Sequence, residues 1–76
     1  MNKTVIYHLA KTYLEQQATK KVVDKHLYEI GYTVSYNQDL ENSYKDLNNW
    51  DKFSKGFNQD WLLGYLYGVL EKTKLD

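Results

Sequence analysis

The segment 58-NQDWLLGYLYGVLEKTK-74 decides the fold, because its ten residues from 61 to 70 carry no charge. Asn58 is a suitable helix N-cap, and Asp60 would lie in the first turn. Lys72 and Lys74 would lie near the end, where the helix dipole favours positive charge. The apolar spacing between these signals predicts a helix over residues 59–74.

This predicted helix is apolar almost all the way round. Leucines and a valine form one side, whereas Trp61, Gly64 and Gly68 lie on the opposite side. A helix on the surface of a small protein normally carries charge on its back. The helix is therefore either the central one of a bundle, or its back is a contact surface for another molecule.

Gly64 and Gly68 bear directly on that choice. A glycine inside a helix costs about 1 kcal/mol relative to alanine. The two glycines are four residues apart, so they share a face and allow another backbone to approach closely. That backbone could belong to this chain, to a second copy or to a different protein, and the sequence leaves all three open.

Two further helices are predicted in the first half of the chain. One covers residues 3–17, where apolar residues recur at i, i+3, i+4 and i+7. The other covers residues 19–30, with Gly31 as its C-cap, and the polar stretch 15–21 favours a bend between them near Ala18 and Thr19. The residues expected to face the core are Val5, Ile6, Leu9, Ala10 and Tyr13 in the first helix and Val22, Val23, His26, Leu27 and Ile30 in the second.

Residues 32–36 alternate like a short strand, but no second strand is available to pair with them, so we expect an extended connection. A third helix would start at a cap on Asn37 or Asp39 and end near Trp50 or Phe53. Its inner face would consist of Leu40, Tyr44, Leu47 and Trp50. The predicted class is all-α: a single helical domain over residues 1–76, built as a small bundle of three to four helices with the C-terminal helix at its centre.

The charge composition argues against nucleic acid and membrane partners. Ten acidic residues balance ten basic ones, so no strong field attracts the chain to phosphates. All basic residues are lysines, and arginine is the usual reader of phosphates and guanines. A net charge near zero also mildly favours association between protein molecules. The abundance of Lys, Asn and Tyr indicates an A/T-rich genome, such as that of a low-GC Gram-positive bacterium or its phage.

The sequence contains no recognisable catalytic or metal-binding pattern. His8 and His26 are the only histidines, and the neighbouring acids Asp24 and Glu29 do not share a helix face with His26. The three serines lack a nucleophile elbow, and the glycines do not form a phosphate loop. Cysteine is absent, which excludes disulfides and thiolate chemistry. We therefore expect a protein that is not an enzyme and that has no cofactor and no metal.

No segment predicts export or membrane insertion. The first ten residues lack the apolar core and cleavage site of a secretory signal, since His8 interrupts them. The uncharged stretch 61–70 is about half of the roughly 20 residues that span a bilayer. The expected location is cytoplasmic, with no membrane partner.

Our leading hypothesis is a small non-enzymatic protein-interaction module, made by a phage or mobile element to bind and inhibit a host protein. Tyr and Trp are enriched at binding surfaces because they give a large contact area with a polar tip. Five tyrosines fall off the predicted core faces: Tyr7, Tyr28, Tyr32, Tyr36 and Tyr67. The residues expected to bind the partner, or a second copy in a homodimer, are Trp50, Phe57, Trp61, Gly64, Tyr65, Tyr67 and Gly68.

Two alternatives stay open. The run from Lys25 to Leu47 loosely resembles a helix-turn-helix, which suggests a DNA-associated regulator that uses the first two helices and the lysines at 20, 21 and 25. Its predicted link is longer than the usual turn, and the helix after it is acidic, so nucleic acid is not the favoured partner. The other alternative is a structural subunit of a larger assembly, which a stable higher oligomer would indicate.

Overall fold

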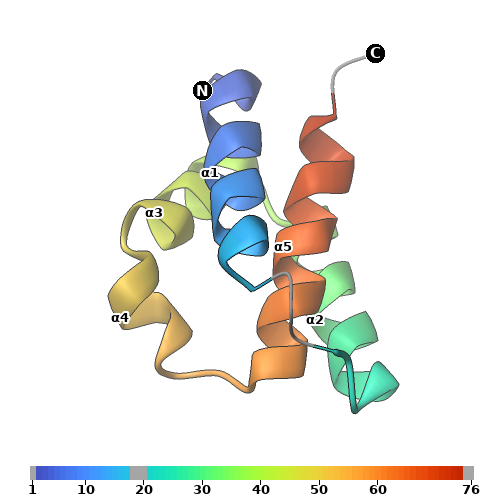
Figure 1. Cartoon of the computed structure of the whole chain (residues 1–76). Helices are drawn as coiled ribbons and strands as arrows, with labels where there is room; N and C mark the ends of the chain where they lie inside the picture. The colour runs from blue at the N-terminus through green and yellow to red at the C-terminus, as the bar shows by residue number, and fades with distance from the viewer. Residues whose placement is uncertain (1, 18–20, 75–76) are drawn as a thin grey trace.

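A computed structural model describes residues 2–17 and 21–74 of the chain, and these residues form five helices and no strand. The C-terminal helix α5 lies between α1 and α2, while α3 and α4 complete the body beside α1 (Figure 1). The predicted all-α class and the central place of the C-terminal helix are confirmed. The helices are α1 (Lys3–Gln16), α2 (Lys25–Asn37), α3 (Leu40–Asn48), α4 (Trp50–Ser54) and α5 (Gln59–Thr73).

Side-chain caps fix where four of these helices begin. Each cap is an Asn or Asp whose side-chain oxygen accepts a hydrogen bond from a backbone N–H in the first turn, at 2.8 to 3.0 Å for the shortest bond of each. Such a cap contributes about 1 kcal/mol. The caps on α3 and α5 are among the residues predicted for that role. The four capping residues are Asn2, Asp24, Asp39 and Asn58.

The hydrophobic core lies on the side of α5 that faces α1 and α3. Leu66 and Val69 of α5 are fully buried there against Ile6 and Ala10 of α1 and Leu47 of α3. α2 covers the opposite side of α5. Because both sides of α5 are covered, no charged side chain is needed between residues 61 and 70.

The prediction for residues 32–36 is wrong. These residues are not an extended connection but the second half of α2, and Gly31 lies inside that helix rather than at its C-cap. The helix begins at Lys25, later than predicted, because Asp24 caps it. Packing against α5 overrides the strand preference of the β-branched and aromatic residues in this segment.

The prediction of which side chains of the second helix are buried is also wrong. Val22, Val23, His26 and Ile30 are exposed, and the residues of α2 that are buried are Gly31 and Ser35. The reason is that α2 turns its small residues, not its large apolar ones, towards α5.

Three smaller corrections concern the other helices. The predicted third helix is two helices, because the backbone leaves helical geometry at Asn49 (φ −124°, ψ 41°). Val5 of α1 is exposed rather than buried. The bend predicted near Ala18 and Thr19 lies outside the described residues.

Candidate functional site

Backbone contact between α2 and α5 explains both glycines of α5. A Cβ atom built on Gly64 would lie 2.8 Å from the carbonyl carbon of Tyr28 and 3.0 Å from the amide nitrogen of Tyr32. A Cβ on Gly68 would overlap the Ser35 hydroxyl. The two glycines therefore serve packing inside the chain, which is the first of the three options that the sequence left open.

Gly31 makes the same close approach from the α2 side. A Cβ on Gly31 would lie 2.9 Å from the carbonyl carbon of Trp61 and 3.1 Å from the amide nitrogen of Tyr65. Small residues thus alternate between the two helices along their contact, as they do where helices of membrane proteins pack closely. We call this contact the small-residue interface; its members are Gly31, Ser35, Gly64 and Gly68.

Hydrogen bonds join α2 and α5 at both ends of this interface. At the start, the buried Asp60 carboxylate of α5 accepts bonds from the backbone N–H groups of Val23 (3.2 Å) and Asp24 (2.9 Å). At the other end, the Lys72 ammonium of α5 donates to the carbonyl oxygens of Ser35 (2.6 Å) and Gln38 (2.9 Å). Because the start of α5 is bonded to the start of α2 and the end of α5 to the end of α2, the two helices run parallel.

Lys72 belongs to a cluster of polar groups between α2, α3 and α5. Its ammonium also donates to the Ser43 hydroxyl, and the Tyr65 hydroxyl donates to Asp46 Oδ2 at 2.7 Å. Gln38 connects the two pairs, since its Nε2 donates to Asp46 Oδ2 at 3.1 Å and its Oε1 lies 3.3 Å from the Ser43 hydroxyl. Each of these groups has a hydrogen-bonding neighbour, so the cluster joins α2, α3 and α5.

Burial perturbs two members of this cluster. It lowers the pKa of the Lys72 ammonium, while the carboxylates of Asp39 and Asp46 act in the opposite direction. Burial raises the pKa of the Tyr65 hydroxyl, and its hydrogen bond to Asp46 raises that pKa further. Burial within the cluster therefore shifts the pKa of Lys72 down and the pKa of Tyr65 up.

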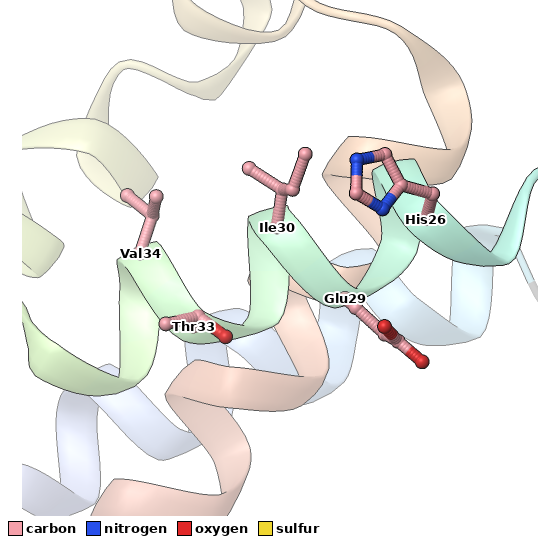
Figure 2. A pocket seen from close by; sticks show the side chains of 5 residues that line it. All are labelled: His26, Glu29, Ile30, Thr33 and Val34. Carbon is pink, nitrogen blue, oxygen red and sulfur yellow. The ribbon is translucent and has the colours of Figure 1, made fainter.

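The outward side of α2 carries large apolar side chains. Ile30 is 39% exposed and Val34 is 45% exposed, and Val23, just before the helix, is 89% exposed. His26, Ile30 and Val34 follow each other at intervals of four, and Figure 2 shows their side chains projecting from the same side of α2. With Glu29 and Thr33 they line a shallow hollow of about 310 Å³. We call these five residues the α2 outer face.

A row of tyrosines borders the α2 outer face. Tyr32 and Tyr36 are stacked with ring centroids 5.9 Å apart, and Tyr28 lies 6.0 Å from Tyr67 of α5. Glu29 and Thr33 also line a second hollow, of about 370 Å³, together with Tyr28 and Tyr32, so the two hollows adjoin at these two residues. Burial raises the pKa of both Tyr28 and Tyr32. Aliphatic and aromatic side chains thus share one exposed surface along α2.

The structure does not gather the seven predicted binding residues into one surface. Four of them are buried within the chain: Trp50, Gly64, Tyr65 and Gly68. Trp61 is half-buried and stacks on the exposed Phe57, with ring centroids 4.2 Å apart. Tyr67 is exposed and lies beside Tyr28. Only Tyr67 therefore adjoins the surface along α2.

Sequence reasoning missed the central residues of the α2 outer face. The apolar periodicity predicts Ile30 in the core, and the strand-like alternation of residues 32–36 predicts Val34 in a connection. The signal that could have found them is the pair Gly31 and Ser35, which repeats the four-residue spacing of Gly64 and Gly68. Two stripes of small residues can pack against each other, and the large residues of α2 must then point outward.

Neither a metal centre nor a membrane span is found in the part of the chain that the structure describes. No three His, Asp or Glu side chains gather there in a way that could hold a metal ion. No helix within these residues has the length and hydropathy needed to cross a bilayer. Comparisons with protein-family models, with curated proteins and with solved structures gave no match to the chain.

Proposed function

We propose that this chain is a non-enzymatic protein-interaction module that binds its partner through the α2 outer face. The observation that carries the proposal is the orientation of α2. Its buried residues are Gly31 and Ser35, whereas Ile30 and Val34 are exposed to solvent. A helix of a small domain normally turns its apolar stripe inward. The opposite orientation is typical of a helix whose outer side is covered by another molecule.

The energetics of burial support the same proposal. Full burial of an isoleucine or valine side chain is worth about 1.5–3 kcal/mol. A domain of 76 residues has little stability to spare, so it gains by using such residues inside. Ile30 and Val34, at 39% and 45% exposed, give only part of that stabilisation until a partner covers the rest of each side chain. An apolar stripe on an exposed helix is also a common mode of helix recognition.

The neighbouring tyrosines suit a binding surface as well. Tyr36 is 49% exposed and stacks on Tyr32, which restricts both rings before a partner arrives. Rigid aromatic rings contribute contact area at low entropic cost, and their hydroxyl groups reach the polar rim of an interface. Aliphatic residues lie at the centre of this surface and tyrosines lie beside them. Protein interfaces commonly have this arrangement of an apolar core and a polar rim.

The nature and setting of the partner are a further part of the proposal. The abundance of Lys, Asn and Tyr indicates an A/T-rich source genome, and we extend the proposal to a phage or mobile-element product that binds and inhibits a host protein. The lack of cysteine agrees with a cytoplasmic setting. A homodimer through the same face is an alternative with the same chemistry. A light-scattering measurement of the solution mass over a range of concentrations distinguishes the homodimer from a structural subunit, which would form a higher oligomer.

The DNA-associated regulator remains the competing function. One observation favours it: only Gln38 and Asp39 separate α2 from α3, so the link is as short as in a helix-turn-helix. The charges oppose it, because Glu41 and Asp46 of α3 would face phosphates with Lys45 as the one basic residue of that helix. A gel shift with generic duplex DNA at low salt should therefore show no complex.

A capture experiment with matched variants tests the proposed function. The wild-type chain, an Ile30→Asp/Val34→Asp double variant and a Lys11→Asp control on the exposed side of α1 are immobilised and compared with a lysate of the source cells. At least one protein should be retained by the wild type and by the control but lost with the double variant. Identical sets of retained proteins for all three chains would contradict the proposal.

A further inference from the structure

The hydrophobic core is built without α2. In residues 2–17 and 21–74, the members of the core cluster and the apolar residues packed against it come from α1, α3, α4 and α5. The buried residues of α2 itself are Gly31 and Ser35, which carry little apolar surface. Removing α2 from α5 would therefore leave the core cluster in place.

α2 is attached to the body mainly through α5. The contact between α2 and α5 is the most extensive between any two of the described helices, and its close backbone approach contributes dispersion attraction. No large apolar side chain of α2 is fully buried, however, since Leu27, Tyr28 and Tyr32 are only half-buried. Under these conditions the hydrogen bonds at the two ends of the interface carry a large share of the attachment. They involve a carboxylate at Asp60 and an ammonium at Lys72, and hydrogen bonds to charged groups are about twice as strong as neutral ones.

We propose that α2 opens as a separate cooperative unit, leaving α5 while the core stays folded, and that the hydrogen bonds of Lys72 hold it closed. Segments with few buried apolar contacts open with lower free energy than the core of the same protein. Lys72 holds α2 because it binds two carbonyl groups at the end of that helix and the Ser43 hydroxyl of α3 at once. Opening uncovers the side of α5 that carries Gly64 and Gly68. This behaviour belongs to the isolated chain and does not depend on the proposed partner.

Native-state hydrogen exchange of the full chain, read by NMR, tests the proposal. Amides of residues 31–36 in α2 should exchange at least ten times faster than those of Leu66 and Val69 in α5, after correction for their intrinsic rates. Lys72→Met should accelerate the α2 amides about tenfold or more, because it removes hydrogen bonds from a charged group. The rates of Leu66 and Val69 should change less than twofold. Lys74→Met, an exposed lysine just after α5, is the matched control and should change neither set.

The exchange rates distinguish separate opening of α2 from unfolding of the chain as one cooperative unit. If the amides of α2 and α5 exchange at one common rate, and Lys72→Met accelerates both equally, α2 is part of the global folding unit and the proposal is overturned. Unfolding of the whole Lys72→Met chain would overturn it too, since the core should not need this residue. Asp60→Asn, at the other end of the interface, should again accelerate the amides of α2 more than those of Leu66 and Val69.

Discussion

Gly64 of α5 faces the backbone of Tyr28 of α2 so closely that a Cβ atom at this position would lie 2.8 Å from the Tyr28 carbonyl carbon. This approach sets the distance between the two helices along their whole contact. It also sets the rotation of α2, because the side of α2 that fits against a glycine must itself be free of large side chains. Ile30 and Val34 are exposed as a direct consequence.

Gly64→Ala should therefore destabilise the fold. Alanine adds about 1 kcal/mol of helix propensity, but its Cβ would force two backbones apart, and such overpacking typically costs about 1–3 kcal/mol or more. Because the added atom meets backbone rather than a flexible side chain, the cost should lie at the upper end of that range, which leaves a net loss of about 2 kcal/mol in urea denaturation.

Gly56→Ala is the matched control for that variant. Gly56 has no positive φ, and the nearest atom to an added Cβ is the Phe53 carbonyl oxygen at 3.8 Å. The free energy of unfolding should change by less than about 0.5 kcal/mol, or rise slightly. Equal effects of the two substitutions would show that the close contact at Gly64 has no energetic importance.

Tyr65→Phe should weaken the polar cluster without leaving a cavity. The substitution removes the hydroxyl that donates to Asp46 Oδ2 and leaves a carboxylate with one fewer donor. The expected loss is about 1–3 kcal/mol in thermal or chemical denaturation. Tyr44→Phe on α3 serves as the comparison, since no hydrogen bond of its hydroxyl appears in the described residues, and it should cost clearly less. A Tyr65→Phe chain as stable as the wild type would refute the structural role of this bond.

Stability should fall as the pH rises above about 10. Tyr28, Tyr32 and Tyr65 have pKa values raised in the folded state, so their contribution is complete below the unfolded value near 10 and is lost as the pH rises through the folded pKa. Lys72 acts oppositely, because its lowered pKa makes folding more favourable as the pH rises towards 10.5. Urea denaturation at pH 8.5 and 11 should show a net decrease, and a smaller one in Tyr65→Phe. An identical decrease in that variant would exclude Tyr65 as a cause.

Polar substitutions on the α2 outer face should affect folding much less than substitutions in the core. Ile30→Ser and Val34→Ser replace side chains that are 39% and 45% exposed, so each should lower the free energy of unfolding by about 1 kcal/mol. Leu66→Ala in the core should cost about 2–5 kcal/mol. Denaturation curves of the three variants test this directly. A loss at Ile30 or Val34 as large as that at Leu66 would mean that these side chains support the fold rather than a partner.

The helix signals near α5 were readable from the sequence. Asn58 and Asp39 begin α5 and α3 as capping rules predict, and the uncharged stretch 61–70 belongs to the central helix. These features depend on residues close together in the chain, so their spacing carries the information. The close approach at Gly64 and Gly68 was readable for the same reason.

The identity of the helix that meets those glycines was not readable. Val34 and Tyr36 favour a strand by local propensity, and only contact with α5, some 30 residues away in the chain, makes their segment helical. The candidate surface depends on this long-range pairing, since it is the pairing that turns Ile30 outward. Local periodicity predicts Ile30 in the core, because an apolar helix face is buried in most domains.

Site-specific photo-crosslinking tests the central claim most directly. A photoreactive amino acid is placed at Val34 on the α2 outer face, or at Lys11 on α1 as the control, and the source cells that express the chain are irradiated. We predict an adduct of defined mass from position 34 that disappears with Ile30→Asp, and no such adduct from position 11. Twice the mass of the chain would identify a second copy as the partner, and any other mass a different protein. Absence of an adduct from position 34, or the same adducts from both positions, would contradict the assignment of this face as the binding surface.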